Sequence, residues 1–491
     1  MPHPPEPREI AGQIGVSDPD VDECGPSRAG TFDAGREHAR RLLRACDMEP
    51  APLPDAAHPA REAAREWARS GAMMLTGHAE GPPRFAAGPL ASAARGAALA
   101  LRSLAGESAL DTLDAPALLG ERAALSGLTR HGDRSASGSA RLLPACDGTL
   151  VLNLPRDDDW HLIPAWLEAD LPLEPGHEPG ERDAAWQRVA ALVSNRASEP
   201  LTERGRLMGL AIATANATPA PPPHEPFFEV QHGTESPLGR GARRARLLDL
   251  STLWAGPLAT SLLSLAGIEV LKIESPTRPD GAREGPTAFF DLMNGGKRAC
   301  ALDLRDSHDR GLFERLLESA DIVVESARPR ALSQLGYDAG GWVGERVGRI
   351  WASITGYGRA HEWIAFGDDA ALSAGLAWSP DAGQPDPCFC ADAIADPLTG
   401  LHAAAIILAF MRRGRGGLLD LSLSGIARRA VSAEQEGLAL PVEQGAKGWH
   451  VLADDRALRI EEPRARPILR PAPALAPASE RLLSTWFEAT C

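Results

Sequence analysis

Short apolar segments alternate with helical patterns between residues 247 and 354, and this alternation constrains the fold more than any other feature of the chain. We expect strands at 247–250, 270–273, 301–304, 322–325 and 350–354, and helices at 256–266, 307–319 and 330–335. Strands of four or five residues that alternate with helices predict βαβ units and a parallel sheet. Such sheets bind ligands beyond the carboxyl ends of their strands, often where the strand order reverses. The sequence therefore predicts an α/β domain with a Rossmann-like parallel sheet and flanking helices.

The rest of the chain divides by composition. Proline, glycine and acidic residues dominate residues 1–35, which predicts poor order. Residues 214–241 are first Pro-rich and then Gly-rich, as is typical of a linker. Between these segments we expect a smaller α+β region, with helices at 35–47, 57–70 and about 161–168 and a hairpin arm at 148–154. The sequence thus predicts a disordered start at residues 1–35, an N-terminal half at 36–213 and a linker at 214–241. An α/β domain at 242–435 and a Pro/Ala-rich C-terminal tail at 436–491 follow.

Composition excludes several classes of protein. The net charge of −15 and the pI near 5.4 argue against a nucleic-acid binder, which usually carries a basic face. No apolar run reaches the ~20 residues that span a bilayer, so no membrane partner is expected. The seven cysteines are scattered and odd in number, which favours reduced thiols in the cytoplasm.

The motif that stands out is Gly367-Asp368-Asp369, shortly after the expected strand 350–354. The chain has no P-loop, no G-x-G-x-x-G after a strand, no H-E-x-x-H and no G-x-S-x-G. Adjacent carboxylates in such a place are either solvated turn residues or a nucleophile that forms an anhydride or thioester with an acyl group. Hard cations also favour clustered carboxylates, but no ordered ligand loop accompanies this motif, so we expect no metal.

A weak internal repeat relates residues 88–104 to residues 392–410. In this alignment the alanine runs match, Gly96 matches Gly400, and Ser92 falls opposite Asp396. Alanine-rich helices resemble one another by chance, so the repeat gains weight only from the similarities that follow.

The α/β region resembles class III CoA-transferases, the family of the carnitine and formate CoA-transferases and of the acyl-CoA racemases. The similar segments occur in the family's order at 247–251, 255–257, 265–274, 294–304, 321–329, 352–358, 367–369, 393–396 and 414–423. The resemblance implies the class III CoA-transferase fold, with coenzyme A as a substrate and no other cofactor. It implies acyl-CoA and carboxylic acids as partners.

By this resemblance Asp369 is the nucleophile, with Asp368 in place of the family's aromatic residue and Asp396 as a supporting carboxylate. The nucleophile would form an anhydride and then an aspartyl-CoA thioester. We expect the adjacent carboxylate to raise the pKa of one of the pair. The residues that match the family's basic positions near CoA are Lys272, Lys297, Arg298 and Arg328.

The N-terminal half resembles a second, silent copy of the same family. Residues 147–160 are similar to its small-domain segment, and residues 70–77 to the segment that follows the nucleophile, yet residues 56–71 contain no aspartate. Because the family forms interlaced dimers, the chain is expected to be a homodimer or a pseudo-dimer within itself.

Three functions stay open at this point: a CoA-transferase, an acyl-CoA racemase that uses His361 or His402 beside the aspartate, and a non-catalytic CoA-binding relative. Retention of Asp369 and Asp396 favours the transferase. The replacement of the family's Asn-Phe by Ser326-Ala327 favours the non-catalytic relative.

Overall fold

The computed structural model describes ten stretches of the chain, namely residues 33–49, 59–106, 108–169, 179–215, 226–235, 244–328, 330–377, 386–431, 440–453 and 456–488. Poor order was predicted for residues 1–35. Residues 1–32 of this segment lie outside the described residues.

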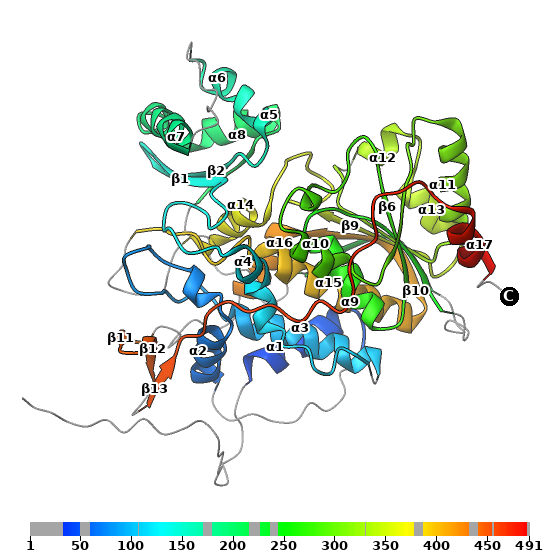
Figure 1. Ribbon diagram of the computed structural model, residues 1–491, viewed down its shortest axis with the longest axis horizontal. Helices are drawn as coiled ribbons and strands as arrows, with labels where there is room; N and C mark the ends of the chain where they lie inside the picture. Colours follow the sequence, from blue (N-terminus) through cyan, green and yellow to red (C-terminus); the bar gives the residue numbers. More distant parts are fainter. Residues whose placement is uncertain are drawn as a thin grey trace, which may run out of the picture.

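A seven-stranded sheet forms the centre of the C-terminal half (Figure 1). Its spatial order is β4 (Glu229–Glu235), β10 (Arg415–Ser422), β9 (Ile350–Thr355), β8 (Ile322–Glu325), β5 (Arg246–Leu250), β6 (Glu269–Glu274) and β7 (Arg298–Ala301). All neighbouring pairs are parallel except β4 with β10. The strand order reverses at β5, which lies between β8 and β6, so the chain has the predicted mostly parallel α/β fold with a switch point.

Both faces of this sheet are covered, as the apolar strand sequences require. On one face α11 (Ser307–Ser319), α13 (Ala339–Glu345) and α17 (Glu480–Glu488) pack over β8 and β9. On the other lie α9 (Ala255–Leu265), α15 (Ala395–Arg413) and α16 (Leu423–Val431). The shorter helices of this half are α10 (Thr287–Asn294), α12 (Ala331–Gln334) and α14 (Gly367–Ala371).

The N-terminal half contains a separate small α+β unit, as expected. Its antiparallel sheet has the order β1 (Ala140–Ala145), β2 (Gly148–Asn153) and β3 (Ala211–Thr214). This sheet packs on α5 (Asp157–His161), α6 (Ile163–Trp166), α7 (Pro179–Val193) and α8 (Ser198–Met208) around a core of its own. The helix expected near 161–168 is the shorter α6, and it does not continue from α5 because Pro164 supplies no N–H to the helical ladder.

The helices α1 (Ala34–Ala45) and α3 (Leu90–Ala105) of this half pack against α15, while α2 (Pro59–Arg69) packs on α3 and α4 (Glu121–Ser126) contacts α10. The two glycines of the sequence repeat have matching roles there. A Cβ on Gly96 of α3 would collide with the carbonyl oxygen of Gly35 in α1, and a Cβ on Gly400 of α15 with that of Ala255 in α9. Each glycine therefore allows one neighbouring helix to cross closely, α1 over α3 and α9 over α15.

Two segments contain more structure than their composition suggests. Strand β4 lies inside the segment expected to be a linker and pairs with β10 at the sheet edge. The segment expected to be a tail holds β11 (Val442–Gly445), β12 (Gly448–Ala453), β13 (Arg456–Arg459) and then α17. Between β13 and α17 this red segment crosses from the N-terminal half to the α/β domain (Figure 1), where Trp486 is fully buried and donates to Ser319 Oγ at 3.0 Å.

Candidate active site

The helix α14 presents the Gly-Asp-Asp motif at the start of its first turn. A Cβ on Gly367 would collide with a carboxylate oxygen of Asp396 and the carbonyl oxygen of Ala393, so only glycine lets α14 approach the start of α15 this closely. Asp369 is the third residue of the helix, and its Oδ1 accepts the otherwise free N–H of Phe366 at 3.0 Å. The local sequence thus fixes the position of the Asp369 side chain.

Asp369 is fully buried, and its two carboxylate oxygens have different surroundings. Oδ1 also accepts a hydrogen bond from Asn153 Nδ2 at 3.0 Å. Oδ2 has no hydrogen-bond partner among the described residues. Burial raises the pKa of Asp369 to about 7, and the hydrogen bonds from Asn153 and Phe366 partly oppose this rise. One oxygen of Asp369 is therefore held in place by two donors, and the other is buried without a donor among the described residues.

Asp368 points into a second group of buried charges. Its Oδ1 accepts the N–H of Ala393 at 2.9 Å, and Arg122 Nε donates to Asp392 Oδ2 at 2.8 Å. Burial raises the pKa of Asp368 to about 7, and the charge of Asp392 raises it further, while Arg122 lowers it. Ala391 and Ala393, on either side of Asp392, have φ values of 55° and 43°. Non-glycine residues in this region are strained, and such strain clusters at functional sites.

Asp396, in the first turn of α15, completes the carboxylate group. It accepts backbone hydrogen bonds from Ala255 and Gly367, and thus connects α15 with α9 and α14. Burial, as the largest cause, raises its pKa to about 6. The three motif carboxylates are therefore brought together. Burial away from water is the main cause of the raised pKa values. Repulsion between like charges, which was the cause expected from the sequence, contributes less.

Two of the residues matched to the family's basic positions are buried inside the protein. Lys272 Nζ forms an ion pair with Asp280 at 2.9 Å and donates to the carbonyl oxygen of Ser251. Lys297 Nζ forms an ion pair with Asp249 at 2.9 Å. Both ammonium groups lie at the carboxyl ends of β5 and β6 and support the loops of the switch point. Contact of either lysine with CoA stays a prediction, and it requires these pairs to open.

The other two basic residues lie nearer the surface. Arg298 forms an ion pair with Glu269 at 3.1 Å and donates to Thr485. Arg328 is exposed, and its pKa is lowered by partial burial and by the charges of Arg156 and Arg278. Arg156 in turn lies over the ring of Phe366, the residue before α14, at 5.9 Å. Arg328 thus lies near two further arginines, one of which, Arg156, reaches the ring of the residue before α14.

Sequence reasoning missed Arg122 and Asn153, which the N-terminal half contributes to the site. Asn153 lies within the expected hairpin arm and is the last residue of β2, so its strand was found, but nothing in the sequence marks it as a partner of Asp369. No local signal marks Arg122, whose guanidinium also lies over Trp254 at 5.1 Å.

The two histidines considered as partners of the aspartate in a racemase have other contacts. His402 is buried, with its Nε2 at 2.6 Å from His38 Nε2, and burial lowers its pKa to about 4. His361 stacks on Trp363 with ring centroids 4.2 Å apart. Over the described ranges, no three His, Cys, Asp or Glu residues are arranged to hold a metal ion. No described helix is both long and apolar enough to cross a membrane.

Known proteins resemble this chain over the α/β domain described above. Residues 244–435 match the family model described as CoA-transferase family III. The succinate–glutarate CoA-transferase of Agrobacterium fabrum is 30% identical over 210 residues, 39% of this chain and 52% of that protein. The mouse succinyl-CoA:glutarate CoA-transferase is 33% identical over 194 residues, 36% of this chain and 44% of that protein.

Among solved structures, a CAIB/BAIF family protein from Brucella suis matches at 24% identity and a TM-score of 0.38, over 45% of this chain and 66% of that chain. The chain spans about half the length of the curated relatives it matches. The matched segment contains the six mutually parallel strands of the sheet, the three buried aspartates and all four basic residues discussed above. The chain therefore carries a CoA-transferase family III domain over residues 244–435.

Proposed function

We propose that the protein transfers CoA from an acyl-CoA to a carboxylic acid, with Asp369 as the nucleophile. The observation that carries the proposal is the state of the Asp369 carboxylate. One oxygen is fixed by two donors, and the other has no partner among the described residues. The family match of residues 244–435 supports the same reaction.

In the first half of the proposed reaction, Asp369 Oδ2 attacks the thioester carbonyl carbon, the C–S bond breaks, and CoA leaves as a thiolate. The thiolate then attacks the carboxyl carbon of Asp369 and releases the first acid, which leaves an aspartyl-CoA thioester. In the second half, the acceptor carboxylate attacks this thioester and CoA leaves again. The thiolate then attacks the acceptor's carbonyl carbon, so the new acyl-CoA forms and the Asp369 carboxylate is regenerated.

Burial of Asp369 has two consequences for this reaction. Exclusion of water protects the anhydride and the thioester from hydrolysis. A fully buried side chain also cannot meet a thioester until the groups that cover it move, so movement of the covering side chains is part of the proposal.

The N-terminal half has a supporting function in this proposal, as a silent family copy fused ahead of the active one. It contributes Asn153 to the nucleophile and Arg122 to the carboxylates behind it. A single chain would then supply both contributions that an interlaced dimer divides between two subunits. Arg328, with Arg156 and Arg278 beside it, is the proposed contact for the CoA phosphates, because guanidinium groups bind phosphate with two parallel donors.

The test is intact-mass measurement after incubation with a panel of acyl-CoA thioesters. We expect a CoA-sized or acyl-sized adduct on the wild-type protein and none on Asp369→Ala. If the wild type binds CoA in calorimetry without an adduct, the transferase proposal fails and the racemase or the non-catalytic binder takes its place. Absence of both adduct and CoA binding would mean that the domain keeps the fold without the function.

The hydrogen bond from Asn153 should set the pH at which Asp369 becomes reactive. Because the reactive form is the carboxylate and the pKa of Asp369 is about 7, we expect the transfer rate to rise tenfold per pH unit below pH 7 and to level off above it. Asn153→Ala removes a donor to the charged form, so the rising limb should move to higher pH by about one unit. Thr149→Ala, at the other end of β2, is the control and should leave the profile in place. An unchanged profile in Asn153→Ala would rule out this tuning.

A further inference from the structure

The segment between β13 and α17, residues 461–478, has no part in the reaction described so far, yet it contacts both halves of the protein (Figure 1). We call it the strap. At its start, Glu461 donates its backbone N–H to the carbonyl oxygen of Ala68 in α2 at 2.8 Å. Near its end, the carbonyl oxygen of Ala476 accepts the N–H of Ala301 in β7 at 2.7 Å. The strap therefore ties the N-terminal half to the edge of the parallel sheet.

Between these two ends the strap packs against the first turn of α4. A Cβ on Gly120, the residue before this helix, would lie 3.3 Å from the Cβ of Pro463 in the strap. Arg466 donates its backbone N–H to Glu121 Oε1 at 3.1 Å, and its Nε lies 3.4 Å from the same oxygen. Because Gly120 has no side chain to cap the helix, the contacts with the strap help to set where the first turn of α4 lies.

Glu121 and Arg466 form a pair that is removed from water. Glu121 is 1% exposed, and its Oε2 has no hydrogen-bond partner among the described residues. The two terminal nitrogens of Arg466 are also buried without a hydrogen bond in the described part of the chain. Burial raises the pKa of Glu121, and the charge of Arg466 lowers it. Loss of either partner would leave a buried charge without its compensation, which is costly.

The residue after Glu121 is Arg122, which reaches the carboxylates of the site. Its guanidinium binds Asp392 with two nitrogens, Nε and Nη2. The residue after Asp392 is Ala393, whose N–H is donated to Asp368 at 2.9 Å. A continuous series of contacts thus joins the strap to the carboxylate beside the nucleophile.

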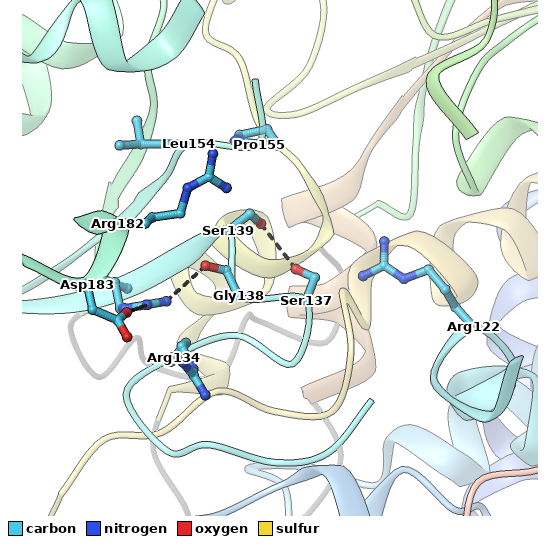
Figure 2. A pocket seen from close by; sticks show the side chains of 10 residues that line it. Arg122, Arg134, Ser137, Gly138, Ser139, Leu154, Pro155, Arg182 and Asp183 are labelled. Carbon is cyan, nitrogen blue, oxygen red and sulfur yellow. Dashed lines mark hydrogen bonds and ion pairs between the residues drawn. The ribbon is translucent and has the colours of Figure 1, made fainter. Parts of the chain in front are cut away.

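A pocket lies on the other side of Arg122. Its volume is about 510 Å³, and Arg134 and Arg182 lie across it from Arg122 (Figure 2). The guanidinium of Arg122 therefore has room to turn away from Asp392 into the pocket. Its contact with Asp392 depends on where α4 holds the Arg122 backbone.

We propose that Arg466 is a positioning residue of the site, which acts through Glu121 and Arg122. By holding Glu121, the strap fixes the helical turn from which Arg122 reaches Asp392 and keeps the neighbouring carboxylates in place. The proposal rests on the proposed function, because an effect on the reaction rate presupposes transfer at Asp369.

The experiment measures the rate of adduct formation with the acyl-CoA thioester to which the wild type reacts in the intact-mass test. Arg466→Gln should lower the maximal rate at least about tenfold, because small displacements of reacting groups have effects of this size. The acyl-CoA concentration that gives half of the maximal rate should stay unchanged. Arg466→Lys keeps the charge and should recover most of the rate. Arg470→Gln removes an exposed arginine from the same strap and, as the matched control, should react like the wild type.

A double-mutant cycle separates positioning from a general loss of structure. Arg122→Lys already lacks the two-pronged contact with Asp392, so in this background Arg466→Gln should slow the reaction by less than about twofold. Rate effects of the two changes that simply multiply would overturn the proposal. A wild-type rate in Arg466→Gln would overturn it as well.

Urea unfolding of the same four proteins gives a readout that needs no activity. The effect of Arg466→Gln on the unfolding equilibrium constant should be at least about threefold smaller in the Arg122→Lys background than in the wild type. Independent effects on unfolding would reject the connection between the strap and Arg122. Coupled unfolding in a protein that forms no adduct would keep this connection and reject the transfer reaction.

Discussion

Asp369→Asn should abolish CoA transfer while making the protein more stable above neutral pH. The amide keeps the shape of the side chain but cannot attack a thioester, so we expect the rate to fall by at least about 10⁴-fold. The measurement is single-turnover transfer from an acyl-CoA to an acid, followed by the appearance of the new thioester.

The stability gain follows from the raised pKa of Asp369. Its folded value of about 7 exceeds the ordinary value of 3.8, so the folded protein binds more protons than the unfolded chain between these two pH values. Stability contributed by the protonated group is therefore fully present near pH 4 and is lost as the pH rises through 7. We expect Asp369→Asn to raise the free energy of unfolding by roughly 2–4 kcal/mol at pH 8 and to leave it unchanged at pH 4. Equal unfolding curves of Asp369→Asn and the wild type at pH 8 would show that burial does not raise the pKa of Asp369.

Arg122→Met should be the most destabilising single change at the site. The Arg122 guanidinium is the cation bound to the fully buried Asp392, and it also lowers the pKa values of Asp368 and Asp396. Removing one partner of a buried pair leaves an uncompensated charge, which costs about 3–5 kcal/mol. We expect the full cost in urea unfolding at pH 8. At pH 5 the loss of unfolding free energy in Arg122→Met should be smaller, because Asp368 and Asp396 are then protonated.

Two further variants separate charge from geometry in this measurement. Arg122→Lys keeps the charge but loses the two-pronged contact with Asp392, so it should lie between the wild type and Arg122→Met. Arg305→Met removes an exposed, ion-paired arginine and should leave the unfolding midpoint unchanged. If Arg122→Met unfolded like the wild type at pH 8, the buried carboxylates would have to be neutral without Arg122.

The sheet could be predicted because its signals are local. The strands β5, β6, β8 and β9 begin and end within one residue of the positions expected from their apolar runs. The strand expected at 301–304 lies three residues earlier, as β7 at Arg298–Ala301. Its first residue is a polar arginine, which does not fit the apolar pattern used to find strands. Strand β4 was missed altogether: it pairs with β10 through its backbone, and its polar sequence of Glu, Gln, His and Thr carries no strand pattern.

The site was predictable only in part. The sequence by itself determined the parallel sheet and the Gly-Asp-Asp motif at the start of α14, because strand length, apolar runs and a glycine turn are properties of neighbouring residues. Tertiary structure alone decided that Asn153 and Arg122 meet carboxylates 216 and 270 residues further along the chain. It also decided that Lys272 and Lys297 are buried and paired, and that three aspartates have raised pKa values. The physical reason is that burial and charge pairing depend on which distant segments meet.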